Sequence, residues 1–506
     1  MTKVRSNATR LFLFLAVCTV LGLGTEAAAQ QATAQLTGTV KDATGAVVPG
    51  VKVTLKNANT NVSRTTTSNR DGDYLFTLVS IGSYELTAEH TGFSKFLQKG
   101  ITLDVNQNGR LDVTLRVGTG TEVIEVNGNV TQVDTVSATL GKVETEQRIL
   151  DLPLVERNTL QLGLLQAGVF TPDQDDGSGN PFSVSGQRSE SLTFLIDGAD
   201  NNDFLGNNIV VNPNPDALAE FKILTNNYNA EYGRTSGGIV NQVIKSGTNS
   251  FHGSLFEFFR NNALNASDYF LKEAPIFKRN LFGGSLGGPI IKDKTFFFVS
   301  YQGNRRREGQ VAPILTVLSP AERNGDFSEL LPVTQLVDPT TGDAYPNNQV
   351  PVDPVIKNYI DKYLPPPNRP NNEFISGPVA RIRDDQFIVR VDHNISPKDI
   401  ISGVYLFDDT PDYFPFHINK GASTGGDVPV GSGYNDFNRY QTGSLTWTHT
   451  ISPTIVNEFR FAANRVATLQ AVPQDKTTPP SSGVHERESR RRRGSGPAAD
   501  VRQRSL

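Results

Sequence analysis

Cysteine is almost absent from this chain, which limits how the protein can be stabilised. Of 506 residues only Cys18 is a cysteine, and it lies in an apolar N-terminal segment. The chain beyond that segment can therefore form no disulfide and no thiolate metal site. We expect burial of apolar side chains and pairing of strands to stabilise the fold.

Histidine is scarce too, which argues against a metal-dependent hydrolase. None of the six histidines begins an HExxH sequence, the helical motif that binds zinc in many metalloproteases. We also recognise no Ser-His-Asp or Cys-His arrangement. The sequence therefore predicts no catalytic residue, no metal ligand, no cofactor and no enzymatic activity.

Basic charge is sparse outside one short segment. Residues 30–474 carry 37 basic and 47 acidic side chains, whereas residues 475–506 carry eight basic and four acidic ones. An acidic body does not attract the phosphate backbone of DNA or RNA. We therefore predict that nucleic acid is not a partner.

Long apolar runs are missing, apart from one near the N-terminus. Residues 11–23 are mostly apolar, follow a basic start and precede three consecutive alanines that end at Ala29. The run is too short for a typical membrane span. It is typical of a secretory signal at residues 1–29, cleaved near Ala29. A lipoprotein signal at Cys18 is the alternative, although Val17 is not the small residue that usually comes before such a cysteine. Either signal places the rest of the chain outside the cytoplasm.

The composition favours strands and turns, with 45 glycines and 29 prolines among abundant Val, Thr, Phe and Asn. Residues 30–118 contain short runs of alternating apolar side chains separated by turn residues. About seven such strands predict an immunoglobulin-like or transthyretin-like β-sandwich. The sequence GTVKDATGAVVPGVKVTL, followed by SNRDGDYLFTLVSIGSYELTAEHTGF, resembles the carboxypeptidase-regulatory-like domain. That domain is an accessory part of such peptidases and not their catalytic part.

One turn of this region carries two carboxylates, Asp71 and Asp73, on either side of Gly72. The pair could ligate calcium. The same residues are typical of a tight turn. We expect a turn, with calcium binding as the alternative.

A β-prone run follows the sandwich, in a linker at residues 119–130. It consists of Glu122, Val123, Ile124, Glu125 and Val126. The run resembles the TonB box of outer-membrane receptors, which a periplasmic energising protein captures as an added strand. Such capture uses main-chain hydrogen bonds and places few demands on side chains. A last sandwich strand, or a simple linker, is the alternative.

Residues 131–250 combine short β-runs with many turn residues. The sequence FSVSGQRSESLTFLIDGADNND is followed by NPDALAEFKILT and then by AEYGRTSGGIVNQVIKSGTN. These motifs, in this order, resemble the plug domain of TonB-dependent outer-membrane receptors, which fills the lumen of a large β-barrel. The resemblance implies an α+β plug. We expect a helix around residues 147–150 and a solvated polar loop at 171–180, whose aspartates could instead hold a cation.

Some plug residues are candidates for holding the plug in its barrel. They are Arg188, Asp197, Gly198, Gly233, Gly237 and Gly238. We expect a buried Arg188 to face a carboxylate of the barrel wall, since an unpaired buried charge is costly; an exposed Arg188 is the alternative. The glycines are expected to allow tight turns or close backbone approach.

From residue 251 the pattern changes to longer strands. Seven are predicted, at 251–261, 280–291, 295–304, 385–395, 399–408, 439–450 and 454–466. Long connections at 262–279, 305–384 and 409–438 alternate with tight turns. Outer-membrane barrels show this asymmetry, with short periplasmic turns and long outer loops. The sequence therefore predicts a partial antiparallel transmembrane β-barrel at residues 251–474, in a mainly β protein.

Alternation is clearest in the fourth of these strands. The residues expected to face lipid are Phe387, Val389 and Val391, and those expected to face the lumen are Gln386, Arg390, Asp392 and Asn394. The aromatic residues at 296–298, Tyr301 and Trp447 are expected to contribute to interfacial girdles. The arginines at 305–307 are expected to be a solvated charge run in the long loop, with binding of an anion as the alternative.

The sequence NLFGGSLGGPIIKDKTFFFVSYQG resembles the first barrel strands of the Oar-like subgroup of TonB-dependent receptors, which carry an N-terminal sandwich. The chain departs from that family in length, because a barrel around a plug needs about 22 strands. Alternation is also lost at 475–506, where four consecutive arginines occur. We expect a shifted reading frame there and a truncated barrel; a disordered basic tail is the alternative.

These resemblances imply TonB-dependent transport across the outer membrane of a Gram-negative bacterium. The implied partners are a TonB-type energising protein, outer-membrane lipid and an unidentified small-molecule, oligosaccharide or peptide substrate. The alternative is a periplasmic or surface binding protein, or a non-functional fragment, in which sandwich and plug act without a closed barrel.

Overall fold

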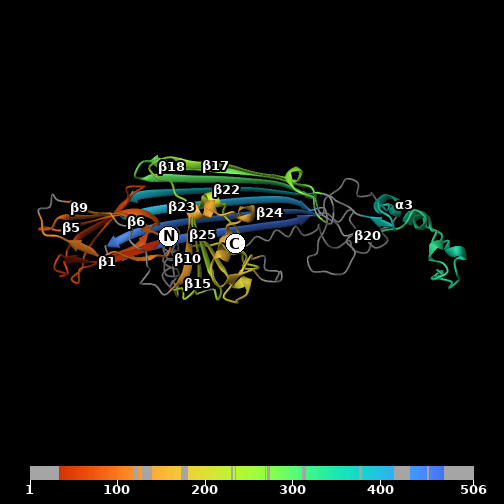
Figure 1. The fold of residues 1–506 in the computed structure, drawn as a ribbon, viewed down its shortest axis with the longest axis horizontal. Coiled ribbons are helices and arrows are strands. Elements are labelled where there is room, and N and C mark those ends of the chain that lie inside the picture. The colour runs from red at the N-terminus through yellow and green to blue at the C-terminus, as the bar shows by residue number, and fades with distance from the viewer. Residues whose placement is uncertain are drawn as a thin grey trace, which may run out of the picture.

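Three β-rich parts follow one another along the chain in the computed structural model (Figure 1). We name them the sandwich (33–127), the plug (139–250, after the resemblance noted above, its role remaining a prediction) and the wall (252–471). The described residues are 33–118, 123–127, 139–171, 180–229, 232–233, 235–267, 269, 274–309, 315–374, 379–414, 434–452 and 455–471. The predicted signal with Cys18, the first residue of the box candidate (Glu122), most of the polar loop at 171–180 and the tail at 475–506 lie outside the described residues.

The sandwich contains two sheets, as the alternation predicts. Its strands are β1 (Ala34–Asp42), β2 (Lys52–Asn57), β3 (Ser63–Thr67), β4 (Asp73–Val79), β5 (Gly82–Glu89), β6 (Lys95–Leu103), β7 (Asn108–Arg110), β8 (Val113–Leu115) and β9 (Val123–Asn127). One sheet has the order β4-β1-β7, with β8 also paired to β1, and the other has the order β3-β2-β5-β6-β9. Every second side chain, such as Val53, Leu55 and Leu86, is buried in one shared core, because successive strand residues point to opposite faces.

The plug is an α+β unit built on a five-stranded sheet. Its sheet strands are β10 (Leu140–Thr145), β13 (Thr193–Ile196), β14 (Ala199–Asp200), β15 (Leu218–Asn226) and β16 (Ile239–Ile244), in the order β10-β15-β16-β13-β14. Helix α2 (Glu146–Asp151), the short 3-10 helices η1 (Val155–Arg157), η2 (Thr159–Leu165), η3 (Ser189–Ser191) and η4 (Pro215–Ala217) and the pair β11 (Val169–Phe170) and β12 (Ser183–Val184) complete it. Helix α2 confirms the helix predicted around 147–150.

All seven predicted barrel strands are present in the wall. They are β17 (His252–Asn261), β18 (Phe277–Ile291), β19 (Thr295–Gly309), β22 (Val379–Ser396), β23 (Asp399–Phe414), β24 (Tyr434–Ser452) and β25 (Ile455–Ala471). Each pairs antiparallel with the next in chain order. Most are longer than predicted, with β24 reaching 19 residues, because strand pairing continues beyond the apolar stretch that alternation detects. Among the described strands, β17 and β25 form the two edges of this open sheet.

The connections confirm the predicted alternation of tight turns and long loops. The loop between β19 and β22 carries β20 (Leu315–Thr316), η6 (Glu322–Asn324), η7 (Ser328–Leu330), η8 (Pro346–Asn348), α3 (Pro354–Tyr363) and β21 (Glu373–Phe374). Figure 1 shows α3 at the opposite end of the long wall strands from the sandwich. The prediction that residues 305–307 belong to this loop is wrong, since they extend β19 and Arg305 forms an ion pair with Asp385.

The wall presents one face to the plug. On β22, Gln386 and Asp392 are buried against the plug, whereas Phe387 and Val391 on the other face are 43% and 38% exposed, which confirms the predicted alternation. The outward position of Tyr301 follows from its pairing with Phe387.

The girdle prediction is wrong for two phenylalanines of β19. Phe296 and Phe298 are each 1% exposed, because their face of the strand is turned towards the plug. Phe298 also belongs to the same buried cluster as the plug core. None of the helices in the described part of the chain is long and apolar enough to cross a membrane.

Candidate functional site

The turn between β13 and β14 is one place where the plug contacts the wall. Asp197 and Gly198 have φ angles of 49° and 73° and join two strands that pair next to the turn. Two consecutive positive φ values define the type I′ hairpin turn, which the sequence Asp-Gly favours. The turn presents the Asp197 carboxylate and the Gly198 carbonyl to the wall.

Arg390 of β22 receives the Asp197 carboxylate. Its guanidinium donates to Asp197 Oδ1 at 3.1 Å and to the carbonyl of Ile244, at the end of β16, at 2.8 Å. The side chains of Arg390 and Asp197 are 15% and 13% exposed. At this depth each charge depends on the other for compensation.

Asp392 completes this cluster. It accepts two hydrogen bonds from Arg390 Nε, the shorter at 2.9 Å. It also accepts from the hydroxyls of Ser246 and Ser402, each at 2.6 Å. The cluster therefore joins two plug segments to two wall strands, and we call Asp197, Arg390 and Asp392 the plug lock.

A second wall strand holds the same hairpin. Arg460 of β25 donates to the Gly198 carbonyl at 2.8 Å, and Asn464 Nδ2 donates to the Asp200 carbonyl at 2.8 Å. Arg460 also forms an ion pair with the buried Glu458. One short hairpin is thus fixed to both β22 and β25.

The prediction that the plug supplies the arginine of this ion pair and the wall supplies the carboxylate is wrong. Arg188 is exposed, as the alternative expectation had it, and it directly precedes the 3-10 helix η3. The carboxylate comes from the plug and the arginine from the wall. A buried arginine facing a carboxylate across this interface is therefore found, with the two partners exchanged.

The candidate glycines have different roles. A Cβ atom on Gly237 would lie 2.8 Å from the Ser191 carbonyl oxygen, and one on Gly238 would lie 2.7 Å from a Val184 methyl group. These two positions therefore require close backbone approach, as expected. Gly233 lies in an exposed turn, where its role stays a prediction.

Two more polar contacts that the sequence did not predict join plug and wall, a hydrogen bond to Asp216 and an ion pair with Glu156. Arg157 of η1 forms an ion pair with Asp216 of η4, and Asp216 also accepts from Ser254 of β17 at 2.7 Å. Glu156 accepts from Arg306 of β19 at 2.7 Å. Alternation could have assigned a face to the wall residues, but no local signal indicates which plug residue lies opposite.

The sandwich is joined to the plug through its turn between β6 and β7. Val105 N donates to Glu220 Oε2 at 2.7 Å, and Lys222 Nζ donates to the Val105 carbonyl at 2.6 Å. Asn106 Nδ2 donates to the Tyr232 hydroxyl at 2.7 Å. Glu220 and Lys222 project from the same face of β15, so one plug strand grips both the amide and the carbonyl of Val105.

Glu220 makes this joint sensitive to pH. Burial raises the pKa of Glu220 to about 8, and Asp104 adds to this, while the hydrogen bond from Val105 and the charge of Lys222 lower it. Burial also raises the pKa of Asp104. Glu220 and Asp104 therefore bind protons more tightly when the sandwich is docked on the plug than when the two are apart.

We expect the docking of the sandwich on the plug to weaken as pH rises. The contribution of Glu220 to docking is full below its ordinary pKa of 4.5 and is lost as pH rises through about 8. Spin labels at Thr65 and Lys398 should therefore give a distance distribution that is narrow at low pH and broad above that value. Glu220→Gln should remove this dependence, whereas Glu329→Gln in the distal loop should keep it. An equally broad wild-type distribution at all pH values contradicts the assignment.

The box candidate forms the edge strand of the sandwich. Backbone residues Val123–Asn127 pair in parallel with β6, and β9 is the last strand of its sheet among the described residues. The alternative of a last sandwich strand thus describes its position. An edge strand leaves one row of backbone groups open to pairing, so a role as an energising strand stays a prediction.

Family comparisons bear on two of the three parts. The family described as "Outer membrane beta barrel domain" matches residues 243–501, and the family described as "Carboxypeptidase regulatory-like domain" matches residues 35–116. The first match covers more than half of the chain. It includes every wall strand.

One curated relative is the TonB-dependent transporter Oar of Myxococcus xanthus, which is 30% identical over 293 residues. That match covers 55% of this chain and 27% of the relative, so the chain spans about a quarter of the relative's length.

Two solved structures are also similar. The outer membrane transporter YddB of Escherichia coli is 12% identical, with 66% of this chain and 40% of that chain covered and a TM-score of 0.41. The siderophore receptor PirA of Acinetobacter baumannii is 15% identical, with 66% and 41% covered and a TM-score of 0.41.

Proposed function

Because the chain belongs to the family of outer membrane β-barrel domains, we propose that it acts in TonB-dependent transport across the outer membrane of a Gram-negative bacterium. The observation that carries this proposal is a folded plug held by buried ion pairs against the inner face of a row of antiparallel strands. A soluble binding protein has no need to attach such a unit to strands whose other face is apolar. The similarity to the transporter from Myxococcus xanthus supports the same function.

A continuous chain of contacts leads from the box candidate to the plug lock. Strand β9 pairs with β6, and the turn after β6 is gripped by Glu220 and Lys222 of β15. Strand β15 pairs with β16, whose last residue, Ile244, binds both Asp197 and Arg390. A pull on β9 can therefore reach the lock through paired strands and hydrogen bonds.

Transport in this scheme is a mechanical opening and needs no covalent chemistry in this chain. A substrate binds on the loop side, a TonB-type protein pairs with the open edge of β9, and traction releases the hairpin at Asp197 from the wall. The substrate class proposed from the sequence is a small molecule, an oligosaccharide or a peptide.

Cysteine pairing in cells tests this function. Ile124→Cys should form a disulfide with a cysteine placed in the edge strand of the host's TonB-type protein, because β-strand addition brings the two backbones within about 5 Å. Thr65→Cys, on the strand at the opposite edge of the same sheet, should form none. Equal pairing at both positions, or none at Ile124, argues against energy coupling through β9.

Fractionation separates this function from a soluble binding role. A transporter should be recovered with the outer membrane and migrate differently after heating, because a folded wall resists detergent. Recovery as a soluble periplasmic protein favours the binding-protein alternative.

A further inference from the structure

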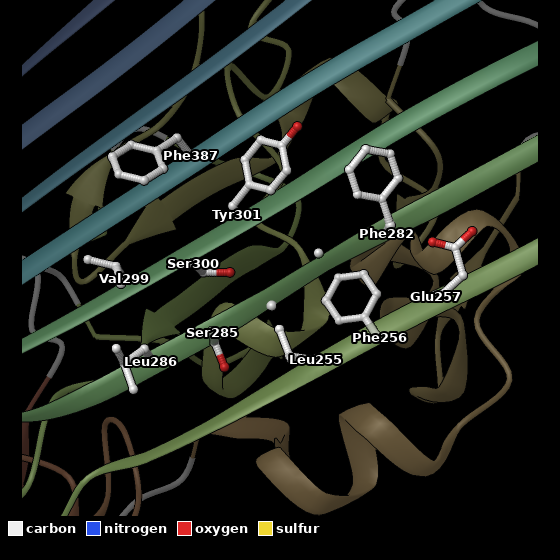
Figure 2. Close-up of a pocket in the computed structure, with 12 residues that line it drawn as sticks. Leu255, Phe256, Glu257, Phe282, Ser285, Leu286, Val299, Ser300, Tyr301 and Phe387 are labelled. Carbon is white, nitrogen blue, oxygen red and sulfur yellow. The ribbon is translucent and has the colours of Figure 1, made fainter.

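The outward face of the wall contains an apolar groove that the transport mechanism does not use. It has a volume of about 730 Å³, and Figure 2 shows Phe282, Tyr301 and Phe387 standing along it. Gly284 forms part of its floor, and a Cβ atom there would lie 2.6 Å from a Leu255 methyl group. A side chain at position 284 would fill this part of the groove, so glycine at this position keeps the groove open.

The groove belongs to the outer face and not to the plug side. Leu286 and Phe387 are 46% and 43% exposed, whereas the adjacent Ile388 is fully buried in the core shared with the plug. The groove therefore opens towards the hydrocarbon of the membrane in which such a wall lies.

A dense group of basic side chains lies on the same outward face, on the loop side of the groove. Strand register places Lys278 beside Arg307, and Arg307 beside Arg381. Arg305 pairs with Arg383 in the same way. The period of two along β19 and β22 puts these side chains on the face of Tyr301 and Phe387. We call these five residues the basic cluster.

The basic cluster has little internal compensation. Arg305 forms an ion pair with Asp385 at 2.6 Å, and Tyr301 donates to the same carboxylate at 2.6 Å. Among the described residues, no carboxylate lies within ion-pair distance of the side chains of Lys278, Arg307, Arg381 or Arg383, and Asp385, which interacts electrostatically with Arg383, is already paired with Arg305. Glu257 lines the groove at the level of Phe282, below the cluster.

The neighbouring sector of the wall, formed by β23, β24 and β25, has fewer basic side chains without a partner. There Arg439 of β24 forms an ion pair with Asp409 of β23 at 2.8 Å, and Arg465 of β25 donates to Gln441 at 2.9 Å. Gln441 is neutral and leaves the charge of Arg465 unbalanced, but the uncompensated basic side chains are densest in the sector formed by β18, β19 and β22, which also carries the groove.

We propose that this face binds one anionic lipid of the outer leaflet, with an acyl chain in the groove and the phosphates of its headgroup on the basic cluster. The loop side of the wall is the outer side, so the cluster lies at the level of outer-leaflet headgroups; this step rests on the proposed outer-membrane location. Six residues of a tilted strand separate Tyr301 from Arg307, roughly 15–20 Å at about 3.3 Å per residue. That span suits a lipid whose chain begins at the phosphate level and descends along the wall. Arginine is well suited to phosphate because its planar fork can donate two hydrogen bonds to one group.

Native mass spectrometry of the full chain in phosphatidylcholine nanodiscs doped with diphosphoryl lipid A tests the site. The wild type should retain one lipid A molecule in preference to phosphatidylcholine. The double variant Arg307→Gln/Arg381→Gln should bind lipid A about thirtyfold more weakly, since each basic side chain near a membrane surface contributes about a fivefold change. The matched control Arg439→Gln/Arg465→Gln makes the same change in net charge in the other sector and should bind as the wild type does.

Two further experiments test the groove and the basic cluster separately. Phe387→Ala, which removes one side of the groove and leaves the cluster intact, should weaken retention of lipid A; unchanged retention overturns the acyl-chain part. Inorganic phosphate should not displace the lipid, and displacement shows a simple anion site instead. Equal loss in both double variants, or equal retention of lipid A and phosphatidylcholine, overturns the proposal. If the wild type migrates differently after heating but shows no preference for lipid A, the lipid proposal fails while the proposed outer-membrane function stands.

Discussion

Replacing Arg390 by methionine should lower the free energy of unfolding of the plug by about 3–5 kcal/mol, the usual effect of removing one partner of a buried charge pair. The substitution leaves Asp197 and Asp392 buried without their shared cation. The carbonyl of Ile244 also loses its donor. The loss should appear in the plug and not in the wall, because the wall strands keep their ladder hydrogen bonds.

Hydrogen exchange at the Ile244 amide, which donates to Asp197 at 3.2 Å, measures this loss as denaturant is added. Arg439→Met is the matched control, since its ion pair with Asp409 is exposed and such pairs contribute about 0.2–1 kcal/mol. Adding Asp197→Asn to Arg390→Met should restore part of the stability, because one orphaned charge is removed. Additive effects of the two substitutions would show that the residues act independently and that the lock has no energetic role.

Phe298→Ala should destabilise the attachment of the plug by about 3–5 kcal/mol, the range for removing a large buried aromatic side chain. Phe298 belongs to the wall strand β19, yet it lies 1% exposed in the core that also contains Phe194 and Phe221 of the plug. Truncation leaves a cavity at the plug–wall boundary that neither rigid sheet can close. Pulling the plug out should therefore become easier, and protease should reach plug segments at lower denaturant concentration.

The adjacent Phe297→Ala provides the control for this experiment. Phe297 points to the outer face, where its ring lies 6.4 Å from that of Phe251. Its loss should change protease access to the plug little, although the composition of the deleted group is the same. Similar effects of the two truncations would mean that Phe298 stabilises the wall itself and not the attachment of the plug.

Local pattern accounts for the elements that were predicted well. The two-residue period of side chains in a strand fixes which face each residue takes, and so Gln386 and Phe387 could be placed on opposite faces from the sequence alone. Turn chemistry was equally local, because Asp197-Gly198 supplies the positive φ angles that the hairpin needs. The order of sandwich, plug and wall followed from stretches whose motifs are contiguous in the chain.

Strand ends were predicted less well, because burial patterns fade where strands leave the apolar layer. The strand predicted to end at residue 304 runs to Gly309, carried by backbone pairing with β22 that has no apolar signature. The basic cluster was missed for the same reason. Arg305 and Arg307 follow the apolar stretch and so resemble loop residues in the sequence, whereas the strand register places them beside Arg383 and Arg381.

The sequence by itself determined the class of fold, the number of wall strands and the faces of the clearest one, since these depend on spacing along a few neighbouring residues. Only the tertiary structure decided which charges meet. Asp197 and Arg390 are 193 residues apart, and several arginines share the plug-facing side of the wall. The two-residue period assigns each of these arginines to the same face and does not indicate which of them meets Asp197. In the folded chain the hairpin at Asp197 brings its carboxylate within hydrogen-bond distance of Arg390, and both side chains are buried there. Arg188 stays exposed to solvent.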